Sequence, residues 1–145
     1  MSHSLTKIWI HAIFGTKNRM PLINDNISKL VHEYIQKQLE DLGCNPRIIN
    51  GTADHIHMLF LISREKTIVE IIKNIKGGSS HWINQEELIK LKFSWQIGYG
   101  AYSVSESNVL IVEKYIRNQK EHHRKMTYKE EYDKFMSSHE LGINH

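Results

Sequence analysis

The stretch Asp54-His55-Ile56-His57-Met58-Leu59-Phe60-Leu61-Ile62 decides which fold is expected for this chain. Side chains alternate across a strand, so residues two apart point the same way. The even positions, Ile56 to Ile62, are wholly apolar, whereas the odd positions begin with two histidines and end with two leucines. The pattern predicts a central strand with one face buried under helices, and with His55 and His57 near one end of the other face.

The segments on both sides of this strand predict further strands and helices. The first strand has apolar residues on both faces, which indicates that both faces are at least partly covered. Gly43 is expected to end the first helix, Thr67 begins the second with a capping-box pattern, and Gly77-Gly78-Ser79-Ser80 is expected to bend or break it. The predicted elements are strands over 5–16, 46–51, 55–62 and 95–104, and helices over 26–42, from 67 onward, over 107–123 and, as a short polar helix, after 126.

This order is β-α-β-β-α-β followed by helices, the split βαβ arrangement of ferredoxin-like and RRM-like folds. The expected class is α+β, with an antiparallel sheet, helices on one face and an additional C-terminal helix that carries the candidate catalytic residue. Residues 1–145 are expected to form a single domain, because the sequence shows no internal repeat, low-complexity tract or linker. Many functions share this fold, RNA binding among them, so the fold alone does not decide the function.

The composition restricts the possible classes of protein. Of the 145 residues, 40% are hydrophobic and 24% are charged, which is ordinary for a globular domain. The single cysteine, Cys44, excludes an intramolecular disulfide and a cysteine-rich zinc site. No apolar run approaches the ~20 residues that span a membrane, and no signal-peptide pattern opens the chain, so we expect a cytoplasmic protein. The formal charge of +3 is weak evidence for an anionic partner.

His55 and His57 lie on one face of the predicted strand, about 7 Å apart along the chain, and two such imidazoles can bind one divalent ion. The spacing alone equally allows two histidines that only make hydrogen bonds on a strand surface. Imidazole suits zinc better than magnesium or manganese. A histidine pair with an amide oxygen and waters can still hold a harder ion when a phosphate oxygen completes the coordination shell.

Tyr115 and Gln119 lie one turn apart on the predicted helix over 107–123. Tyr115 falls at the margin of the apolar stripe, where it either seals the edge of the core or directs its hydroxyl into a cleft. A phenol has a pKa of about 10, and a nearby metal or base favours its phenolate form. A tyrosine beside a metal site therefore suggests phosphodiester chemistry through a covalent tyrosyl intermediate, with Gln119 as a metal ligand or an orienting group.

With these residues in view, nearly the whole chain resembles the small single-tyrosine transposases of bacterial and archaeal insertion sequences, in the HUH superfamily. The name of the superfamily refers to its His-hydrophobic-His motif. The resemblance is carried by Thr16-Lys17-Asn18-Arg19, Asp54-His55-Ile56-His57-Met58-Leu59, Ile75-Lys76-Gly77-Gly78-Ser79-Ser80, the run from Trp95 to Ser105, and Tyr115-Ile116-Arg117-Asn118-Gln119-Lys120-Glu121-His122-His123.

The resemblance implies a specific reaction. In such enzymes the residues at the positions of His55, His57 and Gln119 bind Mg²⁺ or Mn²⁺. The tyrosine at the position of Tyr115 attacks single-stranded DNA to give a 5′-phosphotyrosine and a free 3′-OH. A 3′-OH from another cleaved end then resolves the linkage. The family works as a homodimer, recognises subterminal DNA hairpins, and often forms composite sites in which the tyrosine helix of one subunit serves the histidines of the other.

Three alternatives remain open from the sequence: a domesticated relative that processes repeated palindromes, a non-catalytic nucleic-acid-binding module, and a metallophosphoesterase that uses only the histidines. The hairpin, the cleavage site, the preferred ion, the composite or in-chain nature of the site and activity in the host do not follow from the residues. The candidate phosphate contacts are Lys17, Arg19, Lys73, Lys76, Arg117, Lys120, Arg124 and Lys125.

Overall fold

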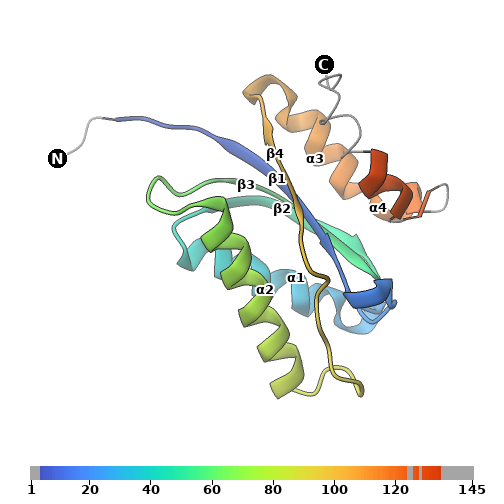
Figure 1. The fold of residues 1–145 in the computed structure, drawn as a ribbon. Helices are drawn as coiled ribbons and strands as arrows, with labels where there is room; N and C mark the ends of the chain where they lie inside the picture. Colours follow the sequence, from blue (N-terminus) through green and yellow to red (C-terminus); the bar gives the residue numbers. More distant parts are fainter. Residues whose placement is uncertain (1–3, 124–125, 128, 135–145) are drawn as a thin grey trace.

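Four antiparallel strands form the centre of the structure (Figure 1). The structure is a computed structural model. It describes residues 4–123, 126–127 and 129–134, without the side chains of 122 and 123. The strands pair in the order β2-β3-β1-β4, which is the predicted split βαβ topology of the ferredoxin-like fold. The elements are β1 (Trp9–Gly15), α1 (Asp25–Asp41), β2 (Asn45–Thr52), β3 (His55–Leu61), α2 (Ile68–Gln85), β4 (Gly100–Val104), α3 (Val109–Arg117) and α4 (Gln119–His123), with short 3-10 helices η1 (Lys17–Arg19) and η2 (Glu106–Asn108).

Helices cover both faces of this sheet (Figure 1). On one face, α1 and α2 pack over the even positions of β3, where Ile56, Met58 and Phe60 are fully buried. On the other face, Leu59 of β3 belongs to a second apolar cluster with Ile116 of α3. The alternation predicted for β3 is therefore confirmed. Because β3 lies inside the sheet with helices above and below, side chains on either of its faces are withdrawn from water.

The predicted break in the second helix is wrong, because α2 runs without interruption from Ile68 to Gln85. The hydroxyls of Ser79 and Ser80 donate to carbonyls one turn earlier in the same helix, so both side chains are satisfied within the helix. Gly78 lies where α2 meets α1, and a Cβ atom there would approach Gln38 Nε2 to 2.5 Å. The glycine thus permits close helix packing here instead of ending the helix.

The predicted strand over 95–104 is too long, since β4 begins only at Gly100. Trp95 makes a single isolated bridge to Thr16, and its ring packs edge-on against Phe14 in the core, with 4.8 Å between ring centroids. Gly98 then adopts a left-handed conformation, with φ of 89°, which interrupts the extended backbone.

The predicted helix over 107–123 is also divided in the structure. A 3-10 turn precedes α3, and Asn118 separates α3 from α4 with a non-helical ψ of 29°. A helical segment over 129–134 follows, as predicted for the residues after Met126. The interruption at Asn118 changes the direction of the chain between the two predicted site residues on this helix, although they remain close. Among the described residues, no helix is both long and apolar enough to cross a membrane.

At Gly51 there is no room for a side chain, because the backbone of β3 at His55 lies too close. It pairs with Ile56 across the β2–β3 hairpin, and a Cβ atom there would lie 2.1 Å from the carbonyl oxygen of His55. We expect Gly51→Ala to lower the free energy of unfolding by about 2–4 kcal/mol, because backbone atoms must move to remove the clash. Gly77→Ala is the control, since a Cβ there meets nothing within 4 Å. It should stabilise helix α2 by about 0.5–1 kcal/mol. Urea unfolding of both variants tests this, and equal stabilities would contradict it.

His32 of α1 makes the stability of the fold sensitive to acid. Its Nε2 atom is buried and has no hydrogen-bond partner among the described residues. Burial, helped by the charge of Lys120, lowers the pKa of His32 from 6.5 to about 4. Between these two values the unfolded chain binds the proton more readily than the folded chain, so the stability contributed by neutral His32 is lost as the pH falls.

We therefore expect the free energy of unfolding of the unmodified protein to fall by about 1–2 kcal/mol more than that of His32→Gln, between about pH 7 and about pH 4.5. Urea denaturation curves at several pH values measure this difference. Other acid-sensitive groups are present in both proteins and cancel in the comparison. Parallel pH profiles would show that His32 titrates normally.

Candidate metal centre and nucleophile

His55 and His57 lie side by side at the hairpin end of β3. Both residues are fully buried, and their ring centroids are 5.2 Å apart. The register of the sheet places them opposite Thr52 and Asn50 of β2 on one side, and opposite Gly15 and Ile13 of β1 on the other. The strand alternation that buries Leu59 under α3 directs the two imidazoles to the same face.

The Nδ1 atom of each imidazole, called here its outer nitrogen, makes a hydrogen bond with a neighbouring side chain. His55 Nδ1 lies 2.8 Å from Asp54 Oδ1 and 2.9 Å from the Thr52 hydroxyl. His57 Nδ1 lies 2.8 Å from Nε2 of His11, a buried residue of β1. Partners of this kind orient a histidine ring and select the nitrogen that stays available for a metal. In both rings that nitrogen is Nε2.

Gln119 reaches the same point from the beginning of α4. The residue is 1% exposed, and its Oε1 atom lies 3.0 Å from His55 Nε2. Its Nε2 atom lies 3.4 Å from the carbonyl oxygen of Tyr115, four residues earlier. The structure thus brings the predicted amide oxygen beside the histidine pair, despite the interruption at Asn118.

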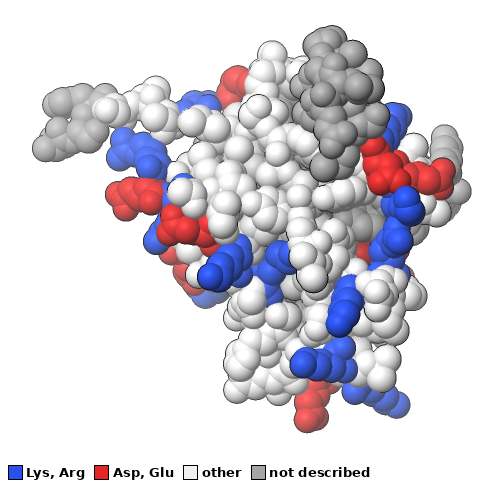
Figure 2. Space-filling view, in the orientation of Figure 1, with Lys and Arg blue, Asp and Glu red and all other residues white. Residues whose placement is uncertain are grey.

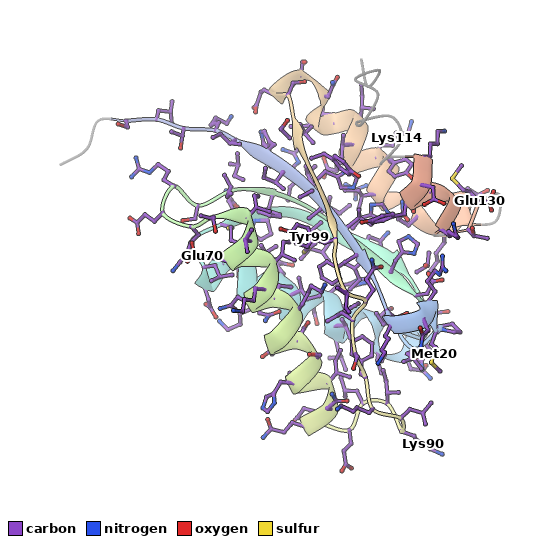
Figure 3. All side chains as sticks on the ribbon, viewed as in Figure 1. Met20, Glu70, Lys90, Tyr99, Lys114 and Glu130 are labelled. Atoms are coloured by element: carbon purple, nitrogen blue, oxygen red, sulfur yellow. The ribbon has the colours of Figure 1, made fainter. Side chains whose placement is uncertain are left out.

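Glu131, which the sequence analysis did not select, occupies the centre of the cluster. Its side chain is 6% exposed, and its Oε1 atom lies 3.1 Å from Nε2 of His55 and 3.1 Å from Nε2 of His57. Its Oε2 atom accepts a hydrogen bond from the Tyr115 hydroxyl. Glu131 belongs to the helical segment over 129–134. Figure 3 labels its neighbour Glu130 beside α4, on the side of the sheet where Lys114 of α3 lies.

The buried charges of this cluster stabilise one another. Burial lowers the pKa of His55, but hydrogen bonds with Asp54, Glu131 and Gln119 and the charge of Glu131 outweigh burial and raise it to about 9. Burial raises the pKa of Glu131, but hydrogen bonds with both histidines and their charges outweigh it and lower that pKa to about 2. The surroundings therefore keep Glu131 ionised.

Tyr115 approaches the histidines of its own chain. Its half-buried ring packs edge-on against His57, with 5.8 Å between centroids, and against the apolar cluster under α3. The margin position expected from the sequence thus places the phenol at the candidate metal centre. Figure 1 shows α3 and α4 above the end of the sheet where β3 begins.

The residues of this cluster suit a divalent ion. Ligand atoms of His55, His57 and Glu131 all lie within 4.8 Å of one another, and Gln119 adds an amide oxygen. Two imidazole nitrogens with two oxygens, one of them from a carboxylate, form a donor set that accepts transition metals such as zinc and manganese, and also magnesium. The partners on the outer nitrogens already orient both rings.

A model of the family described as "Transposase IS200 like" matches residues 4–119. The chain belongs to the IS200-like transposase family. The match includes the histidine strand and both Tyr115 and Gln119, and ends before Glu131. Transposases of this family process DNA, so the buried cluster belongs to a DNA-processing protein. No match was found among curated proteins.

Two solved structures resemble this member of the IS200-like family. One is a candidate transposase from Deinococcus radiodurans R1, with 21% identity over 82% of this chain and 95% of that chain, at a TM-score of 0.66. The other is a REP-associated tyrosine transposase bound to a REP hairpin, with 15% identity over 85% of this chain and 74% of that chain, at a TM-score of 0.62. At these identities the likeness concerns the fold.

Two basic residues predicted to contact DNA lie on the face of the sheet opposite the transposase cluster. Lys73 and Lys76 belong to α2, whereas Tyr115 belongs to α3 on the other face. Lys76 Nζ donates to the carbonyl oxygens of Gln96 and Gly98, at 2.7 Å and 2.9 Å, and burial lowers its pKa. Lys76 therefore holds the loop before β4 in place.

Two other predicted cations lie near the cluster and form surface ion pairs. Arg117 is 2.9 Å from Glu113, and Lys120 is 3.1 Å from Asp25. Exposed pairs of this kind contribute about 0–1 kcal/mol to stability, so a phosphate group can replace the carboxylate at little cost.

The remaining candidates lie at the turn after β1 or in the C-terminal part of the chain. Lys17 and Arg19 are exposed in η1, and Arg19 borders a surface depression that Lys129 also lines. Arg124 and Lys125 lie outside the described residues. In Figure 2, Lys and Arg side chains follow the lower right margin of the face shown, while Asp and Glu lie mainly at its left margin and at the upper right.

Proposed function

We propose that this transposase cleaves and rejoins single-stranded DNA at the ends of an insertion sequence through a 5′-phosphotyrosine on Tyr115. The observation that carries the proposal is the position of the Tyr115 hydroxyl, which donates to a carboxylate that also contacts both buried histidines. A tyrosine that only sealed the core would not need such a neighbour. The family match supports a DNA substrate.

In the proposed reaction the phenol oxygen of Tyr115 attacks the phosphorus at the cleavage site. A bond forms between this oxygen and phosphorus, and the bond from phosphorus to the 3′ oxygen breaks. The phenol loses its proton, and the departing 3′ oxygen gains one to become a free 3′-OH. Attack by a second 3′-OH reverses these steps and joins a new strand, so no ATP is consumed.

His55, His57 and Gln119 would hold a Mg²⁺ or Mn²⁺ ion in this site. When bound, such an ion polarises the scissile phosphate and stabilises the charge that develops on it. Asp54 and His11 hold the two imidazoles in orientation from their outer nitrogens.

Two surface depressions, one on each side of β3, are the places where we propose that DNA approaches the site. One, on the β2 side, is lined by Thr52, Lys29 and Lys120, and the other, on the β1 side, by Thr16, Arg19 and Lys129. Both combine hydroxyl groups with cations, two side-chain types that contact phosphate, although Asp25 and Asp133 also line them and pair with Lys120 and Lys129. We propose that the substrate is single-stranded DNA with a subterminal hairpin, and that two copies of the chain act together as a homodimer.

The proposal is tested with single-stranded oligonucleotides from both ends of the gene's own locus, incubated with protein and Mg²⁺ or Mn²⁺. We expect a protein–DNA adduct that survives denaturation on a gel and disappears when EDTA is added. Binding without an adduct, over several hairpin-bearing substrates, would instead favour a non-catalytic nucleic-acid-binding module. Turnover without an adduct would favour a metallophosphoesterase. Cleavage of repeated palindromes in preference to the locus ends would indicate a domesticated relative.

A further inference from the structure

Glu131 is the buried ionised group that the proposed function leaves without a role. It lies beyond residues 4–119, which the family model matches, and it enters the cluster from the helical segment over 129–134. A glutamate side chain with 6% exposure needs partners for both oxygens, because an unpaired buried charge is costly. The two oxygens of Glu131 have different partners: Oε1 contacts the two histidines, and Oε2 contacts Tyr115.

The Oε1 atom of Glu131 faces the metal centre. It lies 3.1 Å from Nε2 of His55 and 3.1 Å from Nε2 of His57, which are the nitrogens left available by the outer partners of the two rings. Oε1 of Gln119 lies 3.0 Å from the same nitrogen of His55. Four potential ligand atoms from three parts of the chain thus surround one point inside the protein.

The Oε2 atom of Glu131 faces the nucleophile. It accepts a hydrogen bond from the Tyr115 hydroxyl, and Gln119 Nε2 lies 3.4 Å from it. The carboxylate therefore stands between the two histidines and the phenol. A group in this place can fix the distance between the ion and the tyrosine, which is the distance that in-line attack on a bound phosphate depends on.

The chemistry of the other ligands favours a metal role for this carboxylate. Two neutral imidazoles and one amide supply no negative charge, whereas Mg²⁺ and Mn²⁺ prefer carboxylate oxygens. We propose that Glu131 is an additional ligand of the divalent ion through Oε1, and that it positions Tyr115 through Oε2. This inference rests on the proposed function for the identity of the nucleophile, but its metal part can be measured without DNA.

The first test measures Mn²⁺ affinity by titration calorimetry, with no DNA present. We expect Glu131→Gln to bind Mn²⁺ at least about ten-fold more weakly than the unmodified protein, because a charged ligand becomes a neutral one. Glu130→Gln is the matched control, and it should stay within about two-fold, because Glu130 is exposed and a glutamine side chain can still accept the hydrogen bond from the Thr127 N–H. Equal affinities of Glu131→Gln and the control would overturn the metal role.

The second test separates the positioning of Tyr115 from metal affinity. A glutamine at position 131 can still accept a hydrogen bond from the phenol, whereas alanine cannot. At saturating Mn²⁺ we therefore expect Glu131→Gln to form the DNA adduct within about five-fold of the unmodified rate, and Glu131→Ala to be at least about fifty-fold slower. Equal rates for the two variants at saturating Mn²⁺ would overturn the positioning role.

Failure of this inference and failure of the proposed function give different results. If the unmodified protein forms the adduct and Glu131→Gln binds Mn²⁺ normally, only the role of Glu131 is wrong. If the unmodified protein binds Mn²⁺ through Glu131 but forms no adduct with any substrate, the metal role stands, while the proposed reaction and the positioning role fail. If it binds no Mn²⁺ and forms no adduct with either Mg²⁺ or Mn²⁺, both are overturned. Circular dichroism of each variant verifies that it is folded.

Discussion

Tyr115→Phe protein should form no covalent adduct with single-stranded DNA, while remaining folded and able to bind the same DNA. The substitution removes one oxygen atom and keeps the ring that packs against His57 and the cluster under α3. Since the nucleophile itself is lost, we expect the rate of adduct formation to fall by about 10³-fold or more. The measurement is quantitative gel analysis of labelled DNA at saturating Mn²⁺, with DNA affinity measured in parallel.

Tyr34→Phe is the matched control for this experiment. Tyr34 stacks on Trp82 with 4.2 Å between ring centroids, between α1 and α2 on the face of the sheet away from the metal centre. Phenylalanine preserves that stack, so the control should form the adduct at an unchanged rate. An adduct from Tyr115→Phe at the rate of the control would identify another nucleophile and refute the role of Tyr115.

The strand alternation around the histidines was sufficient to predict the centre of the fold. A strand has only two faces, so the apolar even positions of β3 had to lie under the helices, where Met58 and Phe60 are fully buried. The same alternation directed both histidines to the opposite face. The alternation did not predict whether the tyrosine helix packs beside the histidine strand. In the structure, α3 packs on β2 and β3.

Two of the failures of prediction have a tertiary cause. Gly78 looks like a helix breaker in the local sequence, but it lies inside α2, where the side chain of Gln38 approaches from α1. Glu131 is 74 residues away from His57 in sequence, and nothing local distinguishes it from Glu130. One signal was available: a predicted site for a hard cation contained no carboxylate, which calls for an acidic residue elsewhere in the chain.

The second expected result concerns which chain supplies the tyrosine. We expect a mixture of Tyr115→Phe protein with the His55→Ala/His57→Ala double variant to form no more adduct than either component alone. The structure places Tyr115 against His57 of the same chain. Asn50 Nδ2 of β2 donates to the carbonyl oxygens of Ile116 and Arg117, at 3.0 Å and 3.1 Å, and so holds the end of α3 on its own sheet.

Serving the partner's histidines would require each α3 to leave this sheet. Such a move would expose Ile116, which is fully buried, and would separate the Arg47–Glu113 pair, at 3.0 Å. An equivalent surface on the partner would have to replace both contacts. If composite sites do form, random pairing of the two variants would restore about a quarter of the unmodified number of sites, because half of the dimers are mixed and each contains one intact combination. Adduct at that level would show that α3 is exchanged between subunits, whereas its absence would show that one chain builds the complete site.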